Sequence, residues 1–235
     1  MSLRDPMARM ASELSPETRR NRLALYVALG DSFTAGTGCA PGEAWPDRLA
    51  SALRPHNPEL GLRNLAVQGA TSAEVVTQLP EAIELEPDLV TVVCGANDVL
   101  RSTRPDPSRY ADALARILTG LREAVPGVRM VTATAPERWE FLDLGPRTRE
   151  RVEGAIAEFN RVTRRLATRL EVPCLEVSDD PGLGESANFC VDGLHPSPRG
   201  HERAARGFAM LLERELGIGS DHHPEHRTDD EPFEP

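Results

Sequence analysis

The chain has 235 residues, of which 40% are hydrophobic and 27% charged, and its formal net charge is -10 at pH 7. This length suits one large α/β domain or two small ones, and the composition is that of a globular protein. The acidic charge argues against nucleic acid or an anionic membrane as the main partner, because both require a basic protein surface.

The N-terminal segment carries arginines but no continuous apolar stretch, so it does not read as a secretory signal. No apolar run reaches the roughly 20 residues that a membrane span needs. We therefore expect a cytoplasmic protein without a membrane span. Four cysteines are too few for a disulfide framework. A bridge between Cys39 and Cys190 stays open, although free thiols are the expectation without export.

Strand-like and helix-like segments alternate along the chain. Apolar runs predict strands over residues 24–29, 62–67, 88–94, 128–134 and 173–177. Apolar residues at helical spacing predict helices over residues 44–54, 72–79, 107–124, 147–170 and 198–216. Pro80 is expected to end the second of these helices. This alternation predicts an α/β fold in which helices cover both faces of a parallel sheet.

The predicted elements form one domain over residues 23–217, preceded by an extension over residues 1–22. Residues 218–235 are acidic, contain proline and nearly lack apolar side chains, so we predict a disordered tail. Three histidines in the tail could bind a metal, but a solvated tail is the simpler interpretation; they are His222, His223 and His226.

Four polar segments follow strands or lie in loops at one edge of the predicted sheet. They are Gly30-Asp31-Ser32, Gln68-Gly69-Ala70-Thr71, Gly95-Ala96-Asn97-Asp98 and Asp192-Gly193-Leu194-His195. A serine hydroxyl is a weak nucleophile at neutral pH and needs a base within hydrogen-bond reach. His195 is the candidate base for Ser32, because Asp192 can hold the other ring nitrogen in the required tautomer.

An acyl-transfer intermediate also needs hydrogen-bond donors aimed at its developing negative oxygen. The backbone N–H groups of Ser32 and Gly69 and the side-chain amide of Asn97 follow successive predicted strands, so they could converge on that oxygen. A glycine at position 69 would let a substrate approach the backbone closely. The residues therefore predict a catalytic triad of Ser32, His195 and Asp192 beside an oxyanion hole of Ser32, Gly69 and Asn97.

In this order the four segments resemble the sequence blocks of the SGNH, or GDSL, serine hydrolases. Phe33 stands where the family name has leucine, at a position that varies. The resemblance implies a flavodoxin-like three-layer α/β/α sandwich with a five-stranded parallel sheet of order 2-1-3-4-5. It also implies Ser32 as nucleophile and an esterase, lipase or deacylase activity without metal or cofactor.

Several neighbouring residues have competing interpretations. His201 is a rival base, but it lacks an orienting acid and lies in the last predicted helix, on a solvent or helix-packing face. Asp31 is expected to bond nearby backbone, and Asp98 to stabilise the turn below Asn97. Trp139 and Phe141 follow the fourth strand and either line an acyl pocket or cover the core.

The function that these residues predict is hydrolysis of carboxylic esters of short-chain acyl or acetyl groups. A carbohydrate O-acetyl deacetylase and a thioesterase are alternatives within the same chemistry, and a non-catalytic ligand-binding module is the alternative of another class. Substrate choice depends on the loops over residues 35–46, 99–108 and 136–147. The sequence leaves the natural substrate, the oligomeric state and the role of the tail open.

Overall fold

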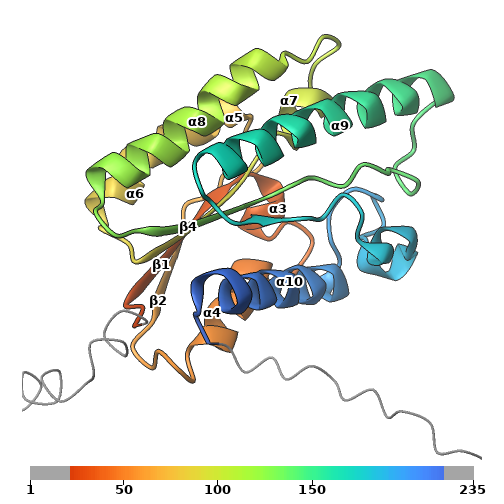
Figure 1. The fold of residues 1–235 in the computed structure, drawn as a ribbon. Coiled ribbons are helices and arrows are strands. Elements are labelled where there is room, and N and C mark those ends of the chain that lie inside the picture. Colours follow the sequence, from red (N-terminus) through yellow and green to blue (C-terminus); the bar gives the residue numbers. More distant parts are fainter. Residues whose placement is uncertain (1–21, 220–235) are drawn as a thin grey trace, which may run out of the picture.

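The computed structural model describes residues 22–219, and a parallel sheet between two layers of helices forms its centre (Figure 1). The five strands lie in the order β2-β1-β3-β4-β5, and every neighbouring pair is parallel. Their bounds are Leu25–Gly30 for β1, Gly61–Asn64 for β2, Leu89–Val93 for β3, Arg129–Ala133 for β4 and Cys174–Leu175 for β5. The predicted three-layer sandwich and its strand order are confirmed.

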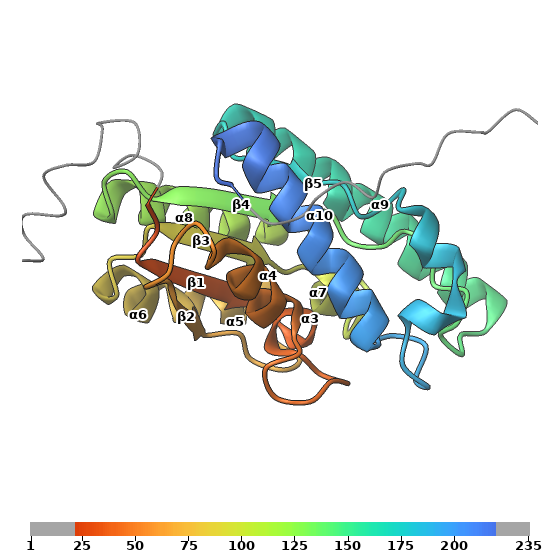
Figure 2. The same cartoon turned by 90° about the horizontal axis from the view of Figure 1, so that it is seen from below.

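Two groups of helices cover the two faces of the sheet (Figures 1 and 2). On one face lie α5 (Ser72–Val75), α6 (Leu79–Glu84), α7 (Ala96–Leu100), α8 (Pro107–Ala124) and α9 (Pro146–Arg169). On the other face lie α4 (Trp45–Leu53) and α10 (Pro198–Leu216). A short helix, α3 (Ser32–Ala35), follows β1, and 3₁₀ turns cover η1 (Val76–Gln78), η2 (Pro181–Gly184) and η3 (Ser186–Asn188).

The strand β1 shows why the sheet is covered on both sides. Val27 and Leu29 pack in the cluster with the α8 and α9 side chains, whereas Tyr26 and Ala28 pack in the cluster with α4 and α10. All four side chains are fully buried. A strand that is apolar on both faces requires a helix layer on each, and the sequence of β1 meets that condition.

The two edge strands are shorter than predicted. β2 ends at Asn64 rather than at residue 67, although the N–H groups of Leu65 and Val67 still donate to β1 carbonyl oxygens, at 2.9 and 3.1 Å. β5 spans only Cys174–Leu175 of the expected 173–177. An edge strand has one neighbour instead of two, so fewer hydrogen bonds hold its ends in the ladder.

The expected helix over residues 72–79 is in fact three short helical segments, and the interpretation of Pro80 is wrong. α5 ends at Val75, η1 follows, and α6 begins at Leu79 with Pro80 in its first turn. A proline at that position loses no hydrogen bond, because the first N–H groups of a helix have no partner within it. Pro80 therefore begins a helix instead of ending one.

Two short helices, α3 and α7, do not appear in the sequence-based prediction. They have 4 and 5 residues, which is too short to show an apolar period. Each begins within three residues of the end of a strand, β1 or β3. They matter because both start at the edge of the sheet where the polar segments gather.

The predicted extension and tail lie almost entirely outside the described residues, as do the three histidines of the tail. Ile218, which the prediction assigned to the tail, is fully buried in the cluster with α4 and α10. Across residues 22–219, no helix combines the length and the apolar character needed to cross a bilayer.

Candidate active site

The turn from β1 into α3 holds a serine at the carboxyl edge of the sheet. Gly30 ends β1 where a side chain would collide with the Thr34 hydroxyl and the Val93 carbonyl oxygen, so close packing requires glycine there. Asp31 is the N-cap of α3, and its Oδ1 accepts the Phe33 N–H at 3.0 Å. Ser32, the first residue of α3, is thereby held at a helix N-terminus with only 4% of its surface exposed.

The three residues predicted as a triad are joined by hydrogen bonds. The Ser32 Oγ lies 3.0 Å from His195 Nε2. The other ring nitrogen, His195 Nδ1, lies 2.7 Å from Asp192 Oδ2. This is the arrangement in which an imidazole can take a hydroxyl proton while a carboxylate holds its orientation.

The loop that carries Asp192 and His195 is closed by a tight turn. The Asp192 Oδ1 accepts the N–H groups of Leu194 and His195, at 2.9 and 3.0 Å. Gly193 has a φ of 65°, and a side chain on it would collide with the Phe141 carbonyl group. Glycine is therefore required between the acid and the base, as the spacing predicts.

The electrostatics of Asp192 favour its charged form. Partial burial raises the pKa of Asp192. The hydrogen bonds from the His195 ring and from the Leu194 and His195 N–H groups together lower it by more, so the net pKa lies below its usual range. An ionised Asp192 can stabilise the positive charge that develops on His195 during proton transfer.

The predicted oxyanion residues come from three neighbouring segments. Asn97, in the first turn of α7, donates from Nδ2 to Asp31 Oδ2 at 3.2 Å and to the Ala70 carbonyl oxygen at 3.1 Å. Gly69 has a φ of 76° and open space where a side chain would lie. The Asn97 amide thus links the Ser32 turn to the loop that carries Gly69.

A second set of bonds ties that loop to α7, and it corrects the prediction for Asp98. The Asp98 carboxylate accepts from the N–H and the hydroxyl of Ser72, at 2.7 and 2.6 Å, rather than bonding within its own turn. Arg101 donates to the Gly69 carbonyl oxygen at 2.6 Å. These bonds hold the backbone around Gly69 in a defined position relative to Asn97.

A cavity of about 150 Å³ begins beside these residues, between the sheet edge and α10. Asp31 and Phe33, the chain neighbours of Ser32, line it together with Pro196, the neighbour of His195. Its other walls are mainly apolar and include Ala135, Pro136, Leu175, Leu183, Phe189 and Ala204. The cavity therefore adjoins the turn that carries Ser32, although Ser32 and His195 do not themselves line it.

A model of the GDSL-like Lipase/Acylhydrolase family matches residues 28–203 of this chain, which hold all four polar segments. The chain belongs to that family. Membership makes it a hydrolase of ester bonds, in agreement with the prediction.

Two similar proteins come from bacteria. The chain is 25% identical over 193 residues to an arylesterase of Vibrio mimicus, with 81% of this chain and 88% of the relative covered. It is 25% identical over 195 residues to the spore germination lipase LipC of Bacillus licheniformis, with 75% of this chain and 91% of the relative covered.

Solved structures share the fold of this family member. The structure of TesA superposes with a TM-score of 0.68 at 24% identity, covering 82% of this chain and 99% of TesA. The psychrotrophic esterase EstA of Pseudoalteromonas superposes with a TM-score of 0.64 at 18% identity, covering 83% of this chain and 99% of EstA.

Trp139 does not line the cavity, so its interpretation as part of an acyl pocket is wrong. It is 2% exposed and packs in the cluster between the sheet and α9. Phe141 is half-buried, and its ring lies 5.3 Å from that of Phe189, a wall of the cavity. The loop after β4 therefore sends its tryptophan into the core, where a large apolar ring buries the most surface.

His201, the rival base, is fully buried against α4. Its Nδ1 accepts the Trp45 N–H at 3.2 Å, so the helix-packing alternative is the correct one. Burial lowers the pKa of His201, and the backbone of Thr37 partly offsets this effect. Cys39 and Cys190 are free thiols.

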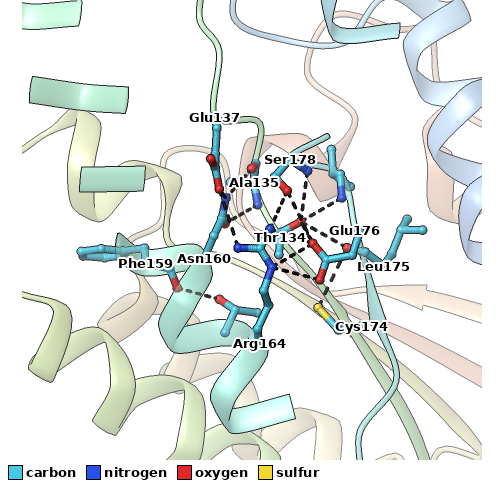
Figure 3. Close-up of polar contacts among 12 residues, drawn as sticks. Thr134, Ala135, Glu137, Phe159, Asn160, Arg164, Cys174, Leu175, Glu176 and Ser178 are labelled. Atoms are coloured by element: carbon cyan, nitrogen blue, oxygen red, sulfur yellow. Dashed lines mark hydrogen bonds and ion pairs between the residues drawn. The ribbon is translucent and has the colours of Figure 1, made fainter. Parts of the chain in front are cut away.

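A polar network beside the cavity escaped the sequence analysis. Figure 3 shows Asn160 and Arg164 of α9 directed at the segments that follow β4 and β5. The Asn160 side chain accepts from the Ala135 N–H and donates to the Ala135 carbonyl oxygen, both at 2.8 Å. Arg164 forms two hydrogen bonds with Glu176 Oε2, at 3.0 and 2.9 Å, and one with Ser178 Oγ at 2.6 Å.

This network fixes two walls of the cavity, because Ala135 and Glu176 both line it. Asn160 is only 2% exposed and lies between the apolar residues Phe159 and Val162. A polar residue on the apolar face of a predicted helix is the signal that could have identified it, because a buried amide must find hydrogen-bond partners.

Proposed function

We propose that this hydrolase cleaves carboxylic esters of short acyl or small aryl groups through an acyl-enzyme on Ser32. The observation that carries the proposal is the continuous chain of hydrogen bonds from Ser32 through His195 to Asp192, with lengths of 3.0 and 2.7 Å. A nucleophile, a base and an orienting acid within hydrogen-bond reach are what acyl transfer through serine requires.

The first step is attack on the ester. His195 Nε2 takes the proton from Ser32 Oγ as the oxygen bonds to the carbonyl carbon. Asp192 stays ionised and stabilises the imidazolium that forms. The tetrahedral intermediate then collapses, and the same proton passes from His195 to the leaving alcohol.

The second step releases the acid. Water gives a proton to His195 and attacks the acyl carbon on Ser32. When the second intermediate collapses, His195 returns the proton to Ser32 Oγ, so one ester and one water become one alcohol and one carboxylic acid.

The oxyanion of both intermediates would be bound by the Ser32 and Gly69 N–H groups and the Asn97 amide. Within residues 22–219, the structure shows no hydrogen bond from either N–H, so both are available. Asn97 must exchange one of its two existing bonds. An oxyanion is a stronger acceptor than the neutral Ala70 carbonyl group, and catalytic hydrogen bonds often form only in the transition state.

The cavity beside Ser32 supports a small substrate. Its volume of about 150 Å³ is comparable to that of an engineered protein cavity that binds benzene. A short acyl chain or an aryl ring fits this volume, and a long fatty chain exceeds it. One relative, the Vibrio mimicus protein, is named an arylesterase.

The test is a pre-steady-state assay with p-nitrophenyl acetate, run beside labelling with a fluorophosphonate probe. We compare the wild type, Ser32→Ala and the control Ser186→Ala, which changes an exposed serine of η3. The burst and the label should both vanish in Ser32→Ala and persist in the control. A labelled Ser32→Ala would show another nucleophile, and an unlabelled, inactive wild type would support the binding-module alternative.

A further inference from the structure

Asp31 is a buried carboxyl group to which the proposed reaction assigns no step. It is 1% exposed, directly precedes Ser32, and lines the cavity. Burial raises the pKa of Asp31 to about 7, although hydrogen bonds from the Phe33 N–H and from Asn97 lower it in part. An ionised Asp31 is therefore held at a cost in folding free energy.

Capping of α3 does not explain why this residue is an aspartate. The cap uses only Oδ1, which accepts the Phe33 N–H at 3.0 Å. Asparagine and serine cap helices about as well as aspartate, and neither carries a charge into a buried site. The second oxygen, Oδ2, is the one that requires a further reason.

Oδ2 accepts from the Asn97 amide, and this contact determines which way that amide faces. Asn97 Nδ2 lies between two oxygens that, with Asp31 ionised, only accept hydrogen bonds: Asp31 Oδ2 at 3.2 Å and the Ala70 carbonyl oxygen at 3.1 Å. If the amide flipped, its own oxygen would face two acceptors without a hydrogen between them. The pair therefore fixes the NH₂ end of Asn97 toward the segments that carry Ser32 and Gly69.

We propose that Asp31 is a positioning residue that holds the donor end of the Asn97 amide at the oxyanion site. The inference rests on the proposed function, in which Asn97 donates to the oxyanion. During the reaction the hydrogen on the Ala70 carbonyl oxygen turns to the substrate, and the bond to Asp31 is kept as the anchor.

The substitution Asp31→Asn separates this role from helix capping. When the one amide oxygen of the variant caps α3, its NH₂ group takes the place of Oδ2 and faces the NH₂ group of Asn97. The donor end of Asn97 is then no longer held in place. Because the oxyanion exists only along the reaction path, kcat should fall while KM changes little.

The experiment is a double-mutant cycle with Asp31→Asn, Asn97→Ala and both together. Hydrolysis of p-nitrophenyl acetate is measured about two pH units above the Asp31 pKa, where the carboxyl group is ionised. We expect Asn97→Ala to lower kcat by about 10²–10³ and Asp31→Asn by about 10–10², with KM within about twofold. The double variant should match Asn97→Ala alone, because Asp31 acts only through Asn97.

The control is Asp88→Asn, directly before β3, where Oδ2 accepts the Ala24 and Leu25 N–H groups. It makes the same chemical change at a carboxylate that accepts backbone N–H groups at the opposite edge of the sheet, and it should leave kcat unchanged. If Asp31→Asn does not fold, Asp31→Ser, which retains a capping hydroxyl, replaces it in the cycle.

Two results overturn the inference while the proposed function stands. The first is an Asp31→Asn variant whose kcat stays within about threefold of wild type. The second is a fall in kcat on Asp31→Asn that is as large in the Asn97→Ala background as in the wild type, because Asp31 would then not act through Asn97. Full activity in Asn97→Ala would instead remove the oxyanion assignment from the proposed function, and the role of Asp31 with it.

Discussion

Two aspartates beside the candidate nucleophile differ in burial and in the direction in which the protein shifts their pKa. Asp31 lies at the buried floor of the site, whereas the Asp192 side chain, in the loop before α10, is 50% exposed. Both accept backbone N–H groups, yet burial raises the pKa of Asp31 and the hydrogen bonds around Asp192 lower its pKa. Access to water and the number of donors therefore decide how each carboxyl group behaves.

The two carboxyl groups therefore suit different roles. The exposed loop carries a carboxylate that stays charged without difficulty, which suits a partner for an imidazolium. At the buried floor, the charge of Asp31 reduces the stability of the fold. This cost fits a residue that positions Asn97 and does not stabilise the folded state. Variants of the two regions should therefore affect activity and stability in different proportions.

The largest expected effect is on activity, from Asp192→Asn. The variant keeps the shape of the side chain but can donate to His195 Nδ1, which favours the wrong tautomer of the ring. We expect kcat for p-nitrophenyl acetate to fall by about 10⁴. Steady-state kinetics measure it, and a loss below about tenfold would mean that Asp192 does not orient His195.

Next in size is the effect of Asp31→Asn on stability. Burial raises the pKa of Asp31 in the folded protein to about 7, well above the ordinary aspartate value of 3.8. The stability that Asp31 contributes is therefore complete below about pH 4 and lost as the pH rises through 7, by as much as about 4 kcal/mol. Asp192 has the opposite sign, because its lowered pKa stabilises the fold at higher pH and that contribution is lost in acid.

Urea unfolding of the wild type and Asp31→Asn between pH 4 and pH 8 measures this difference. As the pH rises, Asp31→Asn should become more stable relative to the wild type, although its kcat is lower than that of the wild type. Parallel curves would show that burial does not disfavour the Asp31 charge, and the contrast between the two aspartates would disappear.

A smaller effect is expected from narrowing the cavity at its α10 wall. Ala204→Leu adds apolar volume there, so p-nitrophenyl hexanoate should lose about tenfold in kcat/KM relative to the acetate ester. Ala111→Leu, at a half-buried position of α8 that does not line this cavity, is the matched control. Equal losses for both esters would place the acyl group elsewhere.

The smallest effect concerns His201, six residues after His195 but fully buried. Because burial lowers its pKa, the stability of the fold should decline as the pH falls below about 6.5, where the unfolded chain takes up the proton first. His201→Asn retains an acceptor for the Trp45 N–H and should flatten that acid limb. Thermal unfolding across this pH range checks it, and an unchanged slope would refute it.

Much of the fold could be predicted because the signals are local. The β-branched run over residues 88–94 marks a strand buried on both faces, and β3 lies within it. The long apolar period over residues 147–170 marks α9, which spans Pro146–Arg169. Pro80 misled the prediction because a proline is equally at home just after one helix and at the start of the next.

The candidate site was predictable in its residues but not in its supporting contacts. The spacing from Asp192 to His195 indicates the acid and base, since one tight turn joins them. Nothing local indicates that Asp31 bonds to Asn97 across 66 positions of sequence, or that Asn160 holds the backbone of Ala135. Trp139 likewise could have faced the cavity or the core, because both environments favour an aromatic ring.

The sequence by itself therefore determined the layered α/β architecture, the strand order implied by the family resemblance, and the set of polar residues at the sheet edge. Those follow from periodicity, turn chemistry and short motifs, which depend on neighbouring residues. Only the tertiary structure decided which carboxyl group is buried, what holds the Asn97 amide, and where a cavity opens beside Ser32. Burial and long-range contacts arise when separate segments pack together, and no single segment contains them.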